Sequence, residues 1–149
     1  MPVPEIFANG PLWTALTATA VAQVLKLLII GATERRFAPE RLLETGGMPS
    51  SHSASVVALA VALGIDYGWD SPWFAIAAVT GGIVMYDATG IRRAAGMQAQ
   101  LINDLVEELG HLFDDGFQPQ ALKTLLGHTY PQVLVGAVLG GVTALIIHL

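Results

Sequence analysis

The chain alternates long apolar stretches with shorter polar segments. The first apolar stretch runs from Pro11 to Gly31, interrupted only by threonines, Gln23 and Lys26. It matches the roughly 20 residues that a helix needs to cross the hydrocarbon core of a bilayer. Three further stretches follow: Pro49 to about Ile65, Pro72 to about Tyr86, and Val133 to Leu149. The pattern therefore predicts a bundle of about four membrane-spanning helices.

A different pattern appears between Met97 and Phe113. Apolar residues recur there at helical spacing and alternate with polar ones, including Asp104, Glu107 and Glu108. This spacing is typical of an amphipathic helix that is too polar to span a membrane. Its acidic face would be repelled by anionic lipid. We therefore expect it to pack on the wet surface of the protein itself, on the cytoplasmic side.

Composition supports a membrane protein. Of 149 residues, 53% are hydrophobic and only 13% are charged, against about 25% charged in ordinary soluble domains. The length allows a single domain, residues 1–149, and the expected fold class is an all-α integral membrane helical bundle. Cysteine is absent, which excludes disulfides and thiolate sites. The net charge of −5 argues against nucleic acid as a partner.

The basic residues of the loops all fall on one side of the predicted bundle. They are Arg35, Arg36, Arg41, Arg92, Arg93 and Lys123. The positive-inside rule then places His52 on the cytoplasmic side and both termini on the opposite side. There, Tyr67, Trp69 and Trp73 resemble an interfacial aromatic belt. We expect an integral protein of a bacterial or organellar inner membrane.

The second span opens with the polar residues Ser50, Ser51 and His52, directly after a proline. The first turn of a helix carries unbonded N–H groups and the positive end of the helix dipole, so this stretch could cradle a phosphate. Serine is also a common N-cap, and capping alone is the alternative interpretation.

Four polar clusters meet at one depth of the predicted bundle. They are Lys26 with Arg35 and Arg36, Ser50 to His52, Asp87 with Arg92 and Arg93, and Lys123 with His128. Lys26 either extends to the interface or reaches into a polar cavity. Two histidines among several cations suit phosphoryl transfer, which needs a nucleophile, an acid and positive charge around the phosphate. A metal site is less favoured because the histidines lack paired carboxylates at ligand spacing and the cations would repel a metal ion.

The segment Pro49 to Ala54, followed far downstream by His128 to Val133, resembles motifs of the type-2 phosphatidate phosphatase superfamily, and most of all its small divergent branch. The resemblance spans about Lys26 to Gly140. It implies that His128 is a nucleophile forming a phosphohistidine, that His52 is the general acid, and that Ser50 and Ser51 hold phosphate. No metal or other cofactor is implied.

The chain departs from the superfamily pattern at several places. In the first motif Lys26 fits the lysine, but Thr33 stands at the usual arginine spacing, and in the third motif Leu122, with Lys123 beside it, stands at the arginine position.

Two further departures bear on the site and the fold. The third motif has an aspartate four residues after the histidine, where this chain has Gln132. Asp87 could replace that carboxylate, or it could form an ion pair with Arg92 or Arg93. The usual core also has six helices, so either the bundle is reduced or a homodimer completes it.

The expected function is therefore that of a membrane phosphatase. It would hydrolyse the phosphomonoester of a lipid phosphate or diphosphate through a metal-independent phosphohistidine. The alternative is a non-catalytic membrane protein of the same fold that binds or transports phosphorylated lipid, which the neutral Gln132 favours.

Overall fold

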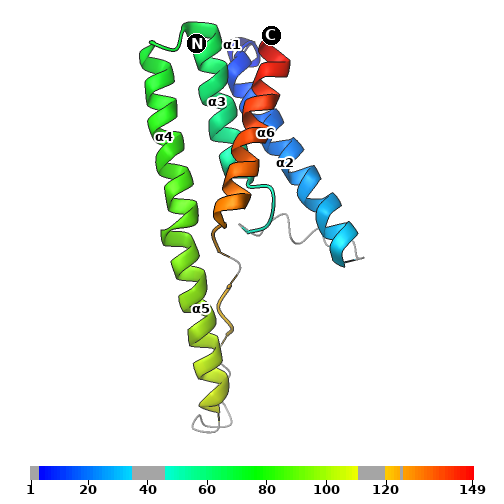
Figure 1. The fold of residues 1–149 in the computed structure, drawn as a ribbon, viewed down its shortest axis with the longest axis vertical. Helices are drawn as coiled ribbons and strands as arrows, with labels where there is room; N and C mark the ends of the chain where they lie inside the picture. Colours follow the sequence, from blue (N-terminus) through cyan, green and yellow to red (C-terminus); the bar gives the residue numbers. More distant parts are fainter. Residues whose placement is uncertain (1–3, 35–45, 111–119, 125) are drawn as a thin grey trace.

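The computed structural model describes residues 4–34, 46–110, 120–124 and 126–149. The described residues form six helices (Figure 1): α1 Pro4–Phe7, α2 Gly10–Glu34, α3 Ser51–Tyr67, α4 Pro72–Thr89, α5 Ile91–Glu108 and α6 Tyr130–His148. The described ranges contain no strand. The predicted all-α helical bundle is confirmed, and α2, α3, α4 and α6 correspond to the four predicted spans.

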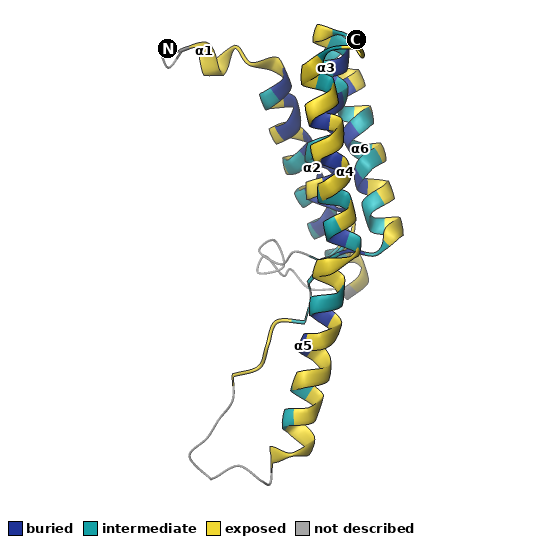
Figure 2. Ribbon diagram, turned by 90° about the vertical axis from the view of Figure 1, so that its left-hand side faces the viewer, coloured by how far each residue is buried: buried dark blue, intermediate teal, exposed yellow. Residues whose placement is uncertain are grey.

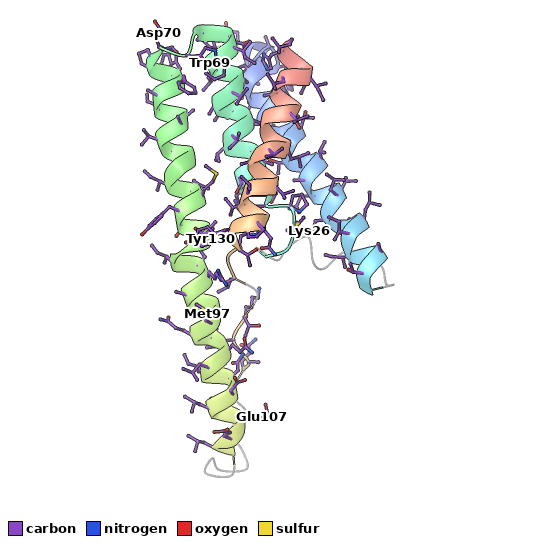
Figure 3. The ribbon with its side chains drawn as sticks, in the orientation of Figure 1. Lys26, Trp69, Asp70, Met97, Glu107 and Tyr130 are labelled. Carbon is purple, nitrogen blue, oxygen red and sulfur yellow. The ribbon has the colours of Figure 1, made fainter. Side chains whose placement is uncertain are left out.

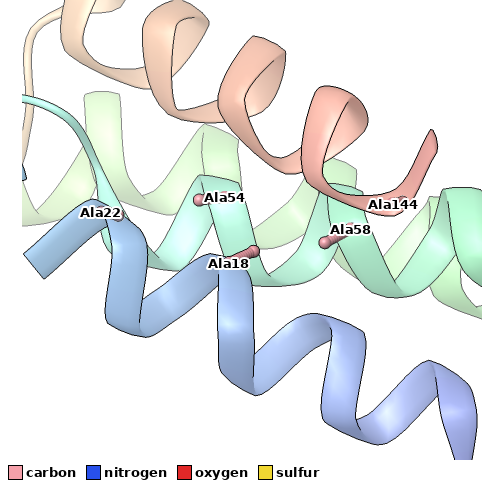
Figure 4. Packing of buried hydrophobic residues seen from close by; sticks show 5 residues of the cluster. All are labelled: Ala18, Ala22, Ala54, Ala58 and Ala144. Atoms are coloured by element: carbon pink, nitrogen blue, oxygen red, sulfur yellow. The ribbon is translucent and has the colours of Figure 1, made fainter. Parts of the chain in front are cut away.

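Helix α3 lies at the centre of the bundle and packs against α2, α4 and α6. Its contact surface consists of small residues, so the neighbouring backbones approach closely. Ala54 and Ala58 of α3 pack with Ala18 and Ala22 of α2 and with Ala144 of α6 (Figure 4). All five alanines are fully buried. The small-residue run in the second span therefore has the expected packing role.

Helices α6 and α3 pack closely against each other. A Cβ atom added to Gly136 would lie 2.3 Å from the carbonyl oxygen of Ser50, and one added to Gly140 would lie 2.2 Å from that of Ala54. Both distances are too short for any side chain. The GxxxG spacing in α6 therefore lets the two helix backbones touch near the polar opening of α3.

Three helical stretches are long and apolar enough to cross a membrane: Gly10–Thr33, Pro72–Glu108 and Tyr130–His148. The second of them combines α4 with α5. The central α3, at 17 residues, is a shorter apolar helix. The outer faces carry large apolar side chains exposed outside the bundle, such as Ile76 and Val79 of α4 and Leu134 and Val138 of α6. These faces are suited to contact with lipid.

The amphipathic helix differs from the prediction in its start and its placement. It begins at Ile91, directly after Gly90, and nearly continues α4. Instead of covering the wet end of the bundle, α5 extends away from it and is largely exposed (Figure 2). Its described polar contact is with the returning chain, where the side-chain amide of Asn103 exchanges two hydrogen bonds of 2.9 Å with the backbone of Leu122. A single glycine does not stop the helix, so α4 and α5 share one direction.

Both termini lie at the same end of the bundle (Figure 1). Trp69 and Asp70 mark that end in Figure 3, and the side chains of Tyr67, Trp69 and Trp73 are exposed, as the aromatic belt requires. A polar network ties α2, α3 and α6 together nearby. His148 lies 2.7 Å from Asp66 through Nδ1 and 2.7 Å from the Thr14 hydroxyl through Nε2.

Candidate functional site

The fold brings His52 and His128 together although they are far apart in sequence. The centroids of their rings are 6.5 Å apart and the ring planes form an angle of 60°. His52 stands in the first turn of α3, and His128 lies just before α6. The backbone N–H of His128 donates a 2.8 Å hydrogen bond to the carbonyl oxygen of Ala88 in α4, so three helices position the pair.

The backbone of Gln132 also connects α6 to the start of α3. Ser50 N–H donates to the carbonyl oxygen of Gln132 at 3.2 Å. The Ser50 hydroxyl caps α3 by accepting from the backbone N–H of Ser53 at 3.3 Å, and it accepts from the Ser53 hydroxyl at 3.0 Å. Ser50 and Ser51 are both buried. For Ser50 the structure shows the capping role, and neither serine lines the pocket described next.

The two histidines line a pocket of about 180 Å³. We call it the two-histidine pocket; its lining residues are His52, Ile83, Val84, Asp87, Ala88, Arg92 and His128. One side is apolar and comes from α4, where Ile83 is 64% exposed at the outer surface. The polar part of the lining consists of the two histidines, Asp87 and Arg92. Such a pocket combines an apolar wall with a few converging polar groups, as ligand sites do.

Asp87 and Arg92 form an ion pair within this pocket. Arg92 Nε donates to Asp87 Oδ2 at 2.5 Å. The Nδ1 atom of His128 instead lies 3.3 Å from Oε1 of Gln132. Among the described residues, Asp87 therefore has the ion-pair role, and the neutral amide of Gln132 is the group next to the ring nitrogen of His128.

Lys26 is buried inside the bundle, with 2% of its surface exposed, and does not extend to the interface. Its aliphatic chain packs against Gly47, whose added Cβ would lie 3.5 Å from Cδ of Lys26. Figure 3 shows Lys26 at the level of the first residues of α6. The polar-interior interpretation of this lysine is the one that the structure supports.

The pKa of His128 is lowered from its ordinary value of 6.5. Burial is the main cause, because it penalises the charged form of the ring. The hydrogen bond with Gln132 opposes this shift, the charges of Lys26 and His52 add to it, and the backbone of Gly47 opposes it. His128 is therefore neutral near pH 7, as a nitrogen nucleophile must be.

The remaining predicted phosphate ligands are not gathered in the two-histidine pocket. Arg93 lines a separate pocket on another side of His128. Lys123 is exposed and lines neither of the two pockets. Arg35 and Arg36 lie outside the described residues. The sequence placed these cations at one depth, but depth alone does not determine which of them face the histidines.

Sequence reasoning missed the backbone that supports the histidines. Gly127 has a φ of +78°, and an added Cβ would lie 2.4 Å from the backbone nitrogen of Arg93. Only glycine fits such a contact. Gly47 likewise has a positive φ of +91° and lies against Lys26. The sequence did contain a signal for both glycines. Gly47 lies just before the segment recognised for Ser50 and His52, and Gly127 directly precedes His128.

Within the described ranges, no three His, Asp or Glu side chains are grouped as the ligands of a metal ion.

Comparison with known proteins decides the family. The Divergent PAP2 family matches residues 7–143, which include both histidines and every described helix except most of α1 and the end of α6. The chain belongs to the divergent PAP2 family. The uncharacterized membrane protein YuiD of Bacillus subtilis (strain 168) is similar to this divergent PAP2 protein, with 39% identity over 152 residues that cover 96% of each chain. No solved structure matches.

Membership confirms the resemblance that the serine-histidine and histidine motifs indicated. It also agrees with the apolar helices in making this divergent PAP2 protein an integral membrane protein. The family relationship suggests a phosphatase-related function at the membrane, and the reaction is a matter for proposal.

Proposed function

We propose that the protein is a membrane phosphatase that hydrolyses the phosphomonoester of a lipid phosphate or diphosphate at the two-histidine pocket. One observation carries the proposal: His52 and His128, from distant parts of the chain, line one pocket together with Arg92. The apolar wall at Ile83 and Val84 suits the lipid portion of such a substrate.

In the first step, His128 attacks phosphorus. A proton on Nδ1 is held by the Gln132 oxygen, which leaves the lone pair of Nε2 available. The Nε2–P bond forms as the P–O bond to the lipid breaks. Protonated His52 gives its proton to the departing oxygen, so the lipid leaves as an alcohol, or as a monophosphate when the substrate is a diphosphate.

In the second step, water hydrolyses the phosphohistidine. Neutral His52 accepts a proton from the water, whose oxygen attacks phosphorus while the N–P bond breaks. Inorganic phosphate is released, His128 is neutral again and His52 is protonated again. Arg92, whose Nε is paired with Asp87, offers its remaining N–H groups to the phosphoryl oxygens from the pocket wall, and buried Lys26 adds positive charge through space.

The test is phosphate release by purified protein in neutral-lipid nanodiscs, from phosphatidate, phosphatidylglycerophosphate and polyprenyl diphosphate. His128→Ala is expected to abolish both turnover and an acid-labile phosphoenzyme formed from ³²P-labelled substrate. His52→Ala is expected to slow transfer most for the substrates with the poorest leaving groups. His148→Gln, a histidine change at the opposite end of the bundle, serves as the matched control and should retain turnover per folded protein.

Two results would overturn this mechanism. The first is activity that chelators remove and a divalent ion restores. The second is a wild-type protein that releases no phosphate but binds phosphorylated lipid, with the binding lost in His128→Ala. This second result would establish the alternative function, a non-catalytic lipid-binding or transport protein, which the uncharged Gln132 beside His128 favours.

A further inference from the structure

A second pocket adjoins His128. It has a volume of about 220 Å³ and lies between α5, the Gly46–Gly47 segment and the chain that leads into α6. We call it the Arg93 pocket; the lining residues that matter here are Gly47, Arg93, Gln100, His128, Thr129 and Gln132. His128 lines both pockets, whereas the neighbouring arginines divide between them, Arg92 in the first and Arg93 in the second.

The described residues that line the Arg93 pocket include a cation but no anion. The pocket contains one guanidinium, two side-chain amides and two threonine hydroxyls, and among the described residues that line it none carries a carboxylate. The two-histidine pocket, by contrast, contains the Asp87 carboxylate paired with its arginine. Unopposed positive charge with several hydrogen-bond donors favours an oxyanion.

Gln132 is one of the residues that line this pocket. Its oxygen is used twice, by the backbone N–H of Thr129 at 3.0 Å and by Nδ1 of His128 at 3.3 Å. Its amide nitrogen has no hydrogen-bond partner among the residues that the structure describes. An anion that accepts from this nitrogen would polarise the amide that holds His128.

The close backbone contact at Gly127 keeps the Arg93 pocket next to the nucleophile. The position of Gly127 against the backbone of Arg93 fixes the start of α5 beside the residue that precedes His128. A charge bound at Arg93 is therefore held near the ring on which positive charge develops during phosphoryl transfer.

We infer that the Arg93 pocket binds a phosphate oxyanion that acts on His128 through Gln132 and supplies the negative charge that the amide lacks. The action on catalysis rests on the proposed function, whereas the binding does not. The phosphate group comes either from free inorganic phosphate or from the headgroup of an anionic lipid, and both sources present the same chemistry to the pocket.

The test measures binding of inorganic phosphate to the full chain in nanodiscs of neutral lipid. Calorimetry gives affinity and stoichiometry, and ¹⁵N NMR of labelled histidine follows the titration of His128. Arg92→Gln removes the cation of the two-histidine pocket and so isolates the second site. In that background we expect phosphate still to bind and to raise the pKa of His128, and we expect Arg93→Gln to weaken this binding at least tenfold.

A charge swap gives a second, independent variant. Gln100→Glu places a carboxylate in the Arg93 pocket and is expected to weaken phosphate binding at least tenfold in the Arg92→Gln background. Gln98→Glu, an exposed residue of the same helix that does not line the pocket, makes the same change in charge and should have little effect. Equal phosphate binding and equal titration of His128 in all these variants would overturn the inference.

The source of the phosphate is distinguished by the lipid. If a headgroup occupies the site, nanodiscs containing phosphatidylglycerol will already show the raised pKa of His128, and Arg93→Gln will remove that effect. If free phosphate occupies it, the lipid change will have no effect and only added phosphate will act. None of these measurements requires turnover, so a failure of the proposed phosphatase activity is seen separately.

Discussion

His128 combines two properties that decide how it can react. Burial keeps its ring neutral, and the group that orients the ring is an uncharged amide. In the proposed mechanism the first property provides a nucleophile near pH 7, and the second offers little stabilisation of the positive charge that the ring would gain on attack. Both properties lead to measurable consequences.

The first consequence is the pH dependence of activity. Because the folded-state pKa of His128 lies below 6.5, the acid limb of kcat/KM is expected below pH 6.5. The unfolded chain binds this proton more readily, so the stability contributed by the neutral ring is present above about pH 6.5 and is lost as pH falls through the folded-state pKa. ¹⁵N NMR of His128 alongside the rate profile checks the assignment. An acid limb above pH 6.5 that follows the titration of His128 would contradict it.

The second consequence concerns Gln132. Gln132→Glu places a charged oxygen where Oε1 lies 3.3 Å from Nδ1, and it keeps the acceptor for the N–H of Thr129. An amide in place of the triad carboxylate costs about 10⁴-fold in rate. We therefore expect Gln132→Glu to raise turnover at least about tenfold and to shift the acid limb upward. Turnover that falls, in a variant whose folding is intact, would show that the neutral amide is required.

Not all of the site could be predicted from the sequence. His52 and His128 were identified because their motifs are local and each adjoins a helix start. The separation of Arg92 from Arg93 was not predicted, because adjacent helical residues point in different directions and only the packed neighbours decide what each one meets. For Asp87 the sequence left two roles open, a partner for His128 or an ion pair with Arg92 or Arg93, and the structure shows the pair with Arg92.

The glycines of α6 allow this helix to pack closely on α3, and this packing sets the distance between the two histidines. A Cβ at Gly140 would lie 2.2 Å from the carbonyl oxygen of Ala54, whereas one at Gly141 would lie 4.0 Å from the nearest side-chain atom. Gly140→Ala is expected to cost about 1–3 kcal/mol by overpacking and to lower turnover. Gly141→Ala is the control, because it gains the same helix propensity without the contact. Thermal unfolding in detergent measures both, and equal stability of the two variants would argue against the close α3–α6 packing.

For the helices as elements, the sequence predicted their existence better than the directions in which they run. Apolar length revealed the four bundle helices, and the amphipathic spacing revealed α5. The near continuity of α4 with α5 was missed because the third span was expected to end near Tyr86, where the apolar run stops, and the amphipathic helix to begin only at Met97. The short helix α1 was not predicted, since four residues carry too little periodicity to be recognised.

The orientation of the whole molecule in the membrane is open to a direct test, because the chain has no native cysteine. Asp70→Cys lies at the end that holds both termini, and Gln98→Cys lies on α5 beyond the histidines. With the basic residues facing the cytoplasm, an impermeant maleimide should label the first in intact cells and the second only after permeabilisation. Labelling of both from one side would rule out the proposed arrangement.

Under the proposed function, the exposed flank of Ile83 determines how a lipid substrate is delivered. This side chain belongs both to the wall of the two-histidine pocket and to the outer surface of α4. A phosphorylated lipid can therefore reach His128 by lateral diffusion within its own leaflet, with its acyl or prenyl chains still in the bilayer. Encounters are then two-dimensional, and the rate follows the mole fraction of substrate in the leaflet. Dilution with an inert phospholipid will slow turnover although the amounts of enzyme and substrate stay the same.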